Sequence, residues 1–273
     1  MAQTFGGVAP FRFVVALAEL SGAVDAEATA LAADLGLTAY EARLLLAPGL
    51  PAVVKTTPDR AIALDLLGKL RARGHGAVAC DGSAVVASSA MVAMSRFAID
   101  DGGVTLLGEA GARLPWDDVL ALVAAVHRQH ADTTTTTRET KFSMQRALLT
   151  GGVALTKTST KETRTTTDQR DGVLYVFRRT GATPWLLREH GTTWSGLPVV
   201  APTEAENYRA TVALLRARAV GATFDDRLVT RKAPERVSGG GGSGNVTVRS
   251  STEAGVDLLA HLLAMWIARG AYR

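Results

Sequence analysis

The sequence predicts an α+β protein in which a small βααβαβ module is followed by an antiparallel β domain, a capping helix and an apolar C-terminal helix. Short apolar runs alternate with helical patterns up to residue 87. Segments rich in β-branched residues fill the middle of the chain, and two later segments have apolar residues at helical spacing. We therefore expect domains at residues 1–87 and 88–236 with a linker at 84–89 between them, a Gly-rich linker at 237–244, and a strand and helix at 245–273.

The composition of the 273-residue chain is typical of a cytoplasmic globular protein. Cys80 is its only cysteine, which excludes an intrachain disulfide and indicates a reducing compartment. The N-terminal residues lack the basic region of a signal peptide, so none is expected. No apolar run reaches the roughly 20 residues that span a bilayer.

The charge distribution argues against nucleic-acid binding. Residues 1–87 carry seven Lys and Arg against eight Asp and Glu, and residues 88–273 carry 23 against 18. The basic excess of the second part is diluted with acids, whereas a nucleic-acid-binding protein concentrates its basic residues on one face. Nucleic acid is therefore not the expected partner, and a protein is expected instead because the sequence lacks catalytic motifs and offers several surfaces suited to contacts.

The first part of the chain predicts the order βααβαβ. Residues 11–20 form the first strand, and a helix over 25–35 ends at Gly36. Thr38 and Glu41 form a capping box, in which each side chain satisfies a backbone donor near the other residue. The remaining elements are a helix at 39–46, a strand at 52–55, a helix at 58–73 and a strand at 77–80.

Residues 11–82 resemble the C-terminal domain of the bacterial ribosomal stalk protein L7/L12. The resemblance lies in glycines, turns and Leu and Ala spacing within residues 35–43, Pro48, 53–55, Arg60, Ala61, Leu70 and 73–78. It implies the compact fold of that family and a docking module, with a packing or dimerisation unit as the alternative. The family binds translation factors through basic residues of its first helix, where this sequence has Asp25, Glu27 and Asp34. Factor binding is therefore not expected.

Residues 114–126 are expected to organise the larger half of the chain. Pro115 cannot donate a ladder hydrogen bond, so it suits the start of a strand, and branched and aromatic residues follow it. Asp117 and Asp118 could also start a short helix, and periodicity alone does not decide between the two. The extended, Thr-rich sequence that comes next favours a strand.

Two Thr-rich segments, residues 132–140 and 156–167, are polar on both alternating sides, yet threonine favours extended backbone. A ribbon that is polar on both sides cannot be core. We therefore predict a long hairpin that reaches into solvent or onto a partner, with a turn or two of helix at 142–149. Its candidate partner-binding residues are Thr135, Thr137, Thr158 and Thr160.

Short strands and one capped helix complete the β domain. Asp100 to Gly103 predict the turn of a hairpin. Thr203 starts a helix that runs to about Ala219, with Ala205, Tyr208, Val212 and Leu215 along one expected core stripe. Strands are expected at 91–99, 104–107, 173–177 and 184–188. In outline, residues 90–220 resemble bacterial pleckstrin-homology-like domains, which implies recognition of a peptide or an acidic headgroup.

The end of the chain predicts a flexible Gly-rich linker, an edge strand at 245–249 and a helix over 253–269. This helix is apolar almost all round, which permits three roles. It could pack on its own domain, form a homo-oligomer contact or lie on a membrane surface. The residues that would make an external contact are Leu259, Leu263 and Trp266.

The sequence offers no catalytic, cofactor or metal constellation, because it has no phosphate-binding loop, dinucleotide fingerprint or nucleophile elbow. His127 and His130 point to opposite faces of a strand, which disfavours a zinc site. Asp257 and His261 lie one helical turn apart and suit a structural hydrogen bond. Adjacent acids, at Asp117–Asp118 and at 225–226, suit caps and turns.

Three interpretations of function follow. The first is a non-enzymatic protein-interaction or scaffold protein. The second is peripheral membrane association through the tail helix and a basic sheet patch, and the third is an enzyme. The patch consists of Arg178, Arg179 and Arg188, close to Trp194.

Overall fold

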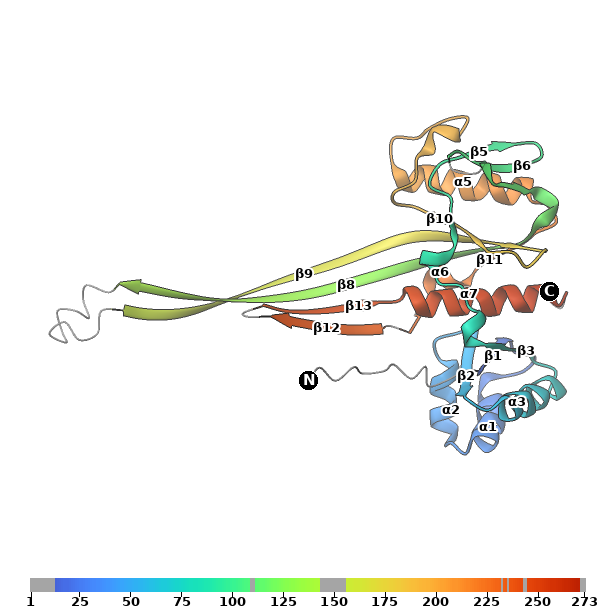
Figure 1. Cartoon of the computed structure of the whole chain (residues 1–273). Helices are drawn as coiled ribbons and strands as arrows, with labels where there is room; N and C mark the ends of the chain where they lie inside the picture. The colour runs from blue at the N-terminus through green and yellow to red at the C-terminus, as the bar shows by residue number, and fades with distance from the viewer. Residues whose placement is uncertain are drawn as a thin grey trace, which may run out of the picture. The chain divides into compact units, whose positions relative to one another are not determined.

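The computed structural model describes residues 13–108, 111–142, 156–231, 233–234, 236–242 and 245–270. The chain is an α+β protein that divides into two compact units (Figure 1). Unit 1 contains the described residues up to His127, those within 171–234 and those from Glu253 onwards. Unit 2 contains those within 128–170 and 235–252. The boundary predicted at residue 87 does not separate compact units, because the first module shares a core with later elements of unit 1.

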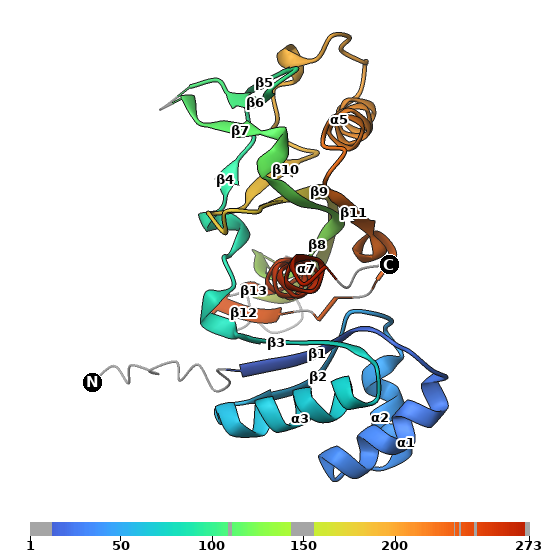
Figure 2. The same ribbon diagram turned by 90° about the vertical axis from the view of Figure 1, so that its right-hand side faces the viewer.

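The first module has the predicted element order. Its three strands form an antiparallel sheet in the order β2-β1-β3. Three helices cover one face of that sheet (Figure 2). The elements are β1 (Phe13–Glu19), α1 (Val24–Leu35), α2 (Ala39–Leu46), β2 (Ala52–Thr57), α3 (Arg60–Ala72) and β3 (Gly76–Asp81).

Local chemistry sets the ends of these helices. Thr38 and Glu41 form the predicted capping box of α2, with both reciprocal hydrogen bonds present. The Asp59 carboxylate accepts a hydrogen bond from the Ala61 amide at 2.7 Å and so caps α3. Gly36 ends α1 with a φ of 69°, a left-handed conformation that favours glycine.

The central strand β1 is buried on both faces. Val15 and Leu17 pack among the helices of the module. Val14 and Ala16 point to the other face, where they join a core cluster that contains the C-terminal helix. The exposed face expected for a small three-stranded sheet is therefore covered by a distant part of the chain.

The segment 114–126 is a strand, as predicted, but a 3₁₀ turn interrupts its start. The strand β7 (Arg113–Pro115) ends at the turn Trp116–Asp118, and β8 (Val119–Phe142) follows. Alternate residues of β8 enter two cores, with Val123 on the side of the C-terminal helix and Leu122 on the other. Burial on both faces explains why this run is continuously apolar.

The β8 strand belongs to a seven-stranded sheet with the order β12-β13-β8-β9-β10-β4, and β11 pairs with β8 in parallel. A separate three-stranded sheet, β5-β6-β7, contains the predicted hairpin turn. There the Asp100 carboxylate accepts from the amides of Gly102 and Gly103. The further elements are β4 (Val92–Ala93), β5 (Phe97–Asp100), β6 (Gly103–Leu106), β9 (Thr156–Arg178), β10 (Trp185–Arg188), α5 (Glu204–Arg218), β11 (Thr223–Asp226) and α6 (Arg227–Thr230).

The C-terminal helix α7 (Glu253–Ala268) lies inside unit 1, between the first module's sheet and the β8–β9 sheet (Figure 2). Packing within its own domain, one of the three predicted roles, therefore accounts for its apolar surface. The fit is close at Gly76, where an added Cβ would lie 2.6 Å from a ring carbon of Trp266.

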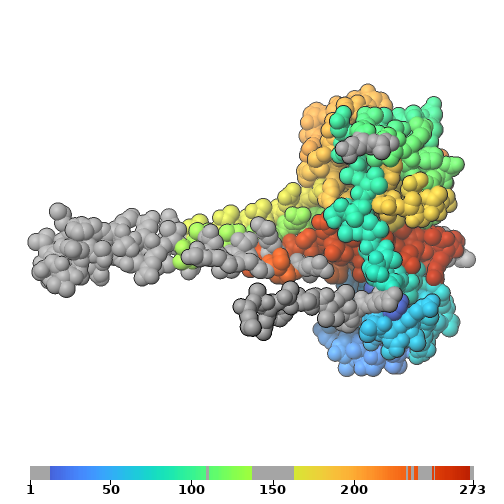
Figure 3. Space-filling view, viewed as in Figure 1, coloured from blue at the N-terminus to red at the C-terminus, as the bar shows by residue number. Residues whose placement is uncertain are grey.

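The segment expected to be a linker at 84–89 also packs on α7 (Figure 3). It contains two 3₁₀ turns, Gly82–Ala84 and Ser88–Ala90, and Ser88 is buried. The prediction of a free linker is therefore wrong here. Among the described residues, no helix has the length and apolar character needed to cross a membrane.

Unit 2 is a four-stranded part of the larger sheet, built from the Thr-rich ends of β8 and β9 with β12 (Arg236–Gly242) and β13 (Asn245–Ser251). The predicted Gly-rich linker is wrong for Ser238–Gly242, which pairs with β13 from Arg249 to Asn245. Strand β13 is not an edge, because it lies between β12 and β8. Pairing on a regular neighbour gives the glycine backbone the hydrogen bonds that a linker would obtain from water. The helix predicted at 142–149 lies almost wholly outside the described residues.

Candidate protein-interaction site

The Thr-rich arm consists of the parts of β8 and β9 that lie in unit 2, and its β9 strand is exposed on both faces. Every residue from Thr163 to Arg170 on β9 is exposed, although alternate residues point to opposite sides of a strand. Strand β10 pairs with β9 only over Val173–Val176. In the described chain, the edge of β9 that faces away from β8 therefore has no neighbouring strand before Gly172.

A cross-strand network orders one face of the arm. The Asp132 carboxylate on β8 accepts hydrogen bonds from the Thr166 hydroxyl and the Arg164 guanidinium, both at 2.6 Å. These two donors lower the pKa of Asp132 to about 2, since they stabilise its charged form. The network keeps β8 and β9 in register although neither strand has an apolar face here.

Two exposed valines extend the same face. Val248 on β13 pairs directly with Asp132 and so points to the same side of the sheet. Val237 on β12 is two residues from Gly239, the partner of Val248, which places it on that side too. We name these five residues, Asp132, Arg164, Thr166, Val237 and Val248, the arm face.

The arm face differs from the residues that the sequence pattern indicated. Thr135 is half-buried on β8, opposite Asn245. Thr137, Thr158 and Thr160 lie on β8 and β9, as predicted, but their side chains lie outside the described part of the structure. The valines were missed because their segment was expected to contain a linker and an edge strand.

The predicted basic patch is wrong, because its arginines are occupied. Arg178 contacts the Asp118 carboxylate at 2.6 Å, and the Arg179 side chain donates to the Gly221 carbonyl. Burial disfavours the charge on Asp118, but hydrogen bonds from the Thr180 amide and Arg178 outweigh it and lower the pKa of Asp118. Arg178 is therefore paired with an acid and Arg179 with a neutral carbonyl, so in the described chain only one of the two charges is compensated.

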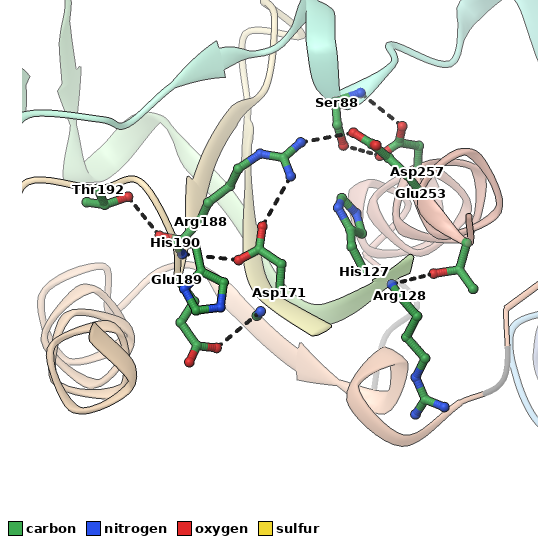
Figure 4. Close-up of polar contacts among 12 residues, drawn as sticks. Ser88, His127, Arg128, Asp171, Arg188, Glu189, His190, Thr192, Glu253 and Asp257 are labelled. Carbon is green, nitrogen blue, oxygen red and sulfur yellow. Dashed lines mark hydrogen bonds and ion pairs between the residues drawn. The ribbon is translucent and has the colours of Figure 1, made fainter. Parts of the chain in front are cut away.

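Arg188 is held between two acids (Figure 4). Its guanidinium contacts Asp171 at 3.2 Å and Glu253 at 2.9 Å. Burial works against the charged form of Arg188, but the hydrogen bonds that it donates to Glu253 and Asp171 outweigh this effect and raise its pKa. Trp194 is also unavailable to a partner, because it is buried with its ring edge-on to Phe97 at 6.3 Å.

The three predicted contact residues of α7 belong to the core of unit 1. Leu259, Leu263 and Trp266 are all buried in the cluster shared with both neighbouring sheets. A partner or a membrane could reach them only if unit 1 opened. The predicted external contact through these side chains is therefore contradicted by their burial.

A buried polar network fastens α7 to the rest of unit 1 (Figure 4). The Asp257 carboxylate accepts from the Ser88 amide at 2.9 Å and from the Ser88 hydroxyl at 2.5 Å. It also accepts from the Tyr175 hydroxyl at 2.7 Å. Burial raises the pKa of Tyr175, so this hydroxyl stays protonated and remains a donor.

The donor role of Tyr175 fixes the neighbouring histidine. His127 Nε2 lies 2.7 Å from the same hydroxyl, so Nε2 must carry the proton that the oxygen accepts. His261 has the other tautomer, because its Nε2 accepts from the Val86 amide and its Nδ1 donates to the Asp257 carbonyl. Both histidines are therefore neutral side chains of the core. The structural hydrogen bond expected between Asp257 and His261 is present, but His261 donates it to the Asp257 backbone carbonyl.

Within the described residues, no group of three or more His, Cys, Asp or Glu side chains could hold a metal ion. The adjacent acids act locally. Asp118 binds Arg178 and Thr180, and Asp225 binds Arg227 at 2.7 Å. Comparison of the chain with protein-family models, curated proteins and solved structures gave no match.

Proposed function

We propose that this chain is a non-enzymatic protein-interaction or scaffold protein of the cytoplasm that holds a protein partner through unit 2. The observation that carries the proposal is the exposure of the arm on both faces, from Thr163 to Arg170, beside an open β9 edge. A sheet without an apolar core face gains little stability from burial. A partner would supply the missing contacts.

The expected mode of recognition is strand addition. The open edge of β9 presents backbone donors and acceptors to an extended segment of the partner. The arm face then gives specificity, because Arg164 and Asp132 offer charge while Val237 and Val248 offer exposed apolar contact. Charged residues on the edge also limit unspecific pairing between copies.

The first module offers a second contact and so supports a scaffold role. Exposed apolar side chains lie on and beside its first two helices, at Val24, Leu37, Tyr40 and Leu44. Tyr40 and Leu44 are one turn apart on α2, which places them on one side of that helix. A docking role agrees with the resemblance to the ribosomal stalk domain, and we keep it as part of the proposal.

Site-specific photo-crosslinking in the source organism tests the proposal. A crosslinking residue at Asp168, which is exposed and lies two residues after Thr166 on the side of the arm face, should capture a distinct protein. The same residue at Thr183, an exposed loop position of unit 1, should not. Val248→Lys should lower the yield at Asp168 at least about ten-fold, because it places a hydrated charge in the apolar contact. Val220→Lys is the matched control, since Val220 is also exposed but lies in unit 1. Identical capture at Asp168 and Thr183 would contradict the proposal.

A further inference from the structure

An apolar groove runs between α5 and the β8 strand within unit 1. It has a cavity volume of about 730 Å³, within the usual range for small-molecule sites. Its apolar lining comes from α5, β8, β11 and α6. The residues that matter for the argument are Ala124, Tyr208, Ala213, Arg216 and Phe224.

The groove exists because α5 is rotated relative to its predicted core stripe. The buried side of α5 is Asn207, Thr211 and Leu215. Asn207 can be buried because its side-chain amide exchanges two hydrogen bonds with the Ala201 backbone. Tyr208 and Val212, predicted as core, are only half-buried, because they pack against the core on one side and line the groove on the other.

Small residues keep the groove open on the sheet side. Ala124 projects from the face of β8 that packs towards α5. Gly172 on β9 lines the same space, and a Cβ there would lie 2.6 Å from a Glu189 carboxylate oxygen. Larger side chains at these positions would fill the groove, so its depth depends on the small residues Ala124 and Gly172.

The two ends of the groove differ in charge. At one end Arg216 lies over the Phe224 ring, with its guanidinium carbon 4.6 Å from the ring centroid. In the described residues Arg216 has no acidic partner, and its side chain is exposed. At the other end the Glu189 carboxylate accepts a hydrogen bond from the Gly172 amide at 3.2 Å. Arg209 lines that end too, so the two opposite charges offset each other there. An anion is therefore favoured at Arg216.

The length of the groove suits a medium-length alkyl chain. Tyr208 and Arg216 lie about 12 Å apart along α5, at about 1.5 Å per residue. An extended chain advances about 1.2 Å per bond, so about 10 bonds cover this path.

We propose that this groove binds one single-chain fatty carboxylate. The carboxylate pairs with the Arg216 guanidinium, whose planar fork matches its two oxygens. The alkyl chain lies on Phe224, passes Ala213 and Ala124, and ends near Tyr208. This site is independent of the protein contacts proposed for unit 2, so either can fail without the other.

Isothermal titration calorimetry of the full chain with dodecanoate, below its micelle concentration, tests the site. Dodecanol is the neutral comparison ligand. We expect dodecanoate to bind with a Kd at least about ten-fold lower than dodecanol, and Arg216→Gln to abolish this difference. Ala213→Leu, at an exposed position that lines the groove, should weaken both ligands at least about ten-fold by occupying the path of the chain.

Arg218→Gln is the matched control, because Arg218 lies on the same helix but contacts Asp101 instead of the groove. It should leave both affinities unchanged. Circular dichroism and the urea midpoint establish that each variant is folded. No binding of dodecanoate overturns the proposal, and so does binding that Ala213→Leu leaves unchanged, which indicates adsorption elsewhere. Binding only to phosphatidylglycerol vesicles, or only to an amphipathic peptide, overturns it as well.

Discussion

Removal of the Tyr175 hydroxyl should destabilise unit 1 out of proportion to the single atom lost. In Tyr175→Phe the ring keeps its place, but Asp257 loses one of its donors and His127 Nε2 loses its acceptor. A hydrogen bond to a charged acceptor contributes about 1.5–3 kcal/mol, and an unsatisfied buried donor costs about 1–3 kcal/mol. The two effects share one network and do not simply add.

We therefore expect the free energy of unfolding to fall by about 3 kcal/mol in this variant. Urea unfolding followed by tryptophan fluorescence measures the change, because Trp185, Trp194 and Trp266 all lie in unit 1. With a slope of about 2 kcal/mol per molar urea, the midpoint should fall by about 1.5 M.

Tyr208→Phe is the matched control. In the described part of the chain the Tyr208 hydroxyl has no hydrogen-bond partner, so its removal should change stability by less than about 0.5 kcal/mol. Equal midpoint shifts for the two variants would refute the assignment of Tyr175 as the link between α7 and the β8–β9 sheet. A shift for Tyr208→Phe alone would do so as well.

Three further predictions concern the core of unit 1. Burial lowers the pKa of His127 and of His261, so the unfolded state takes up protons at a higher pH than the folded state does. The free energy of unfolding should therefore be highest above about pH 6.5 and decline as the pH falls towards 5.5. The urea midpoint at these two pH values measures the decline in a His190→Gln background, because Glu204 raises the pKa of His190 and opposes it. Gly76→Ala should cost about 1–3 kcal/mol in the same urea assay, because the new Cβ meets Trp266 and Glu19 below 3 Å. A chain that ends at Gly239 should lose its near-ultraviolet circular dichroism, since it lacks α7, and an unchanged spectrum would show that α7 is dispensable.

Much of the local structure was predictable because its causes are local. The capping pair Thr38–Glu41 and the left-handed Gly36 mark helix ends without any tertiary contact. The hairpin turn at Asp100 likewise needs only its own residues. The Thr-rich sequence after residue 126 favoured a strand for the apolar run at the start of β8, and the structure shows that both faces of this strand meet a core.

The candidate sites depended on contacts between distant residues. Sequence could indicate that the Thr-rich segments are extended, but it could not place Val248 beside Asp132, more than a hundred positions away. It suggested free arginines, whereas Arg178 finds Asp118 only after folding. A charge pair of this kind leaves no periodic signal in the sequence.

The sequence by itself determined the secondary structure of the first module, the β8 strand and the apolar character of α7. Only the tertiary structure decided that α7 lies inside unit 1, that residues 238–242 form a strand, and that the Tyr208 stripe faces a groove. The physical reason is that burial is not directional. An apolar helix or a glycine-rich extended segment is compatible with several partners, and the one it adopts is set by the surfaces that the remainder of the chain leaves uncovered.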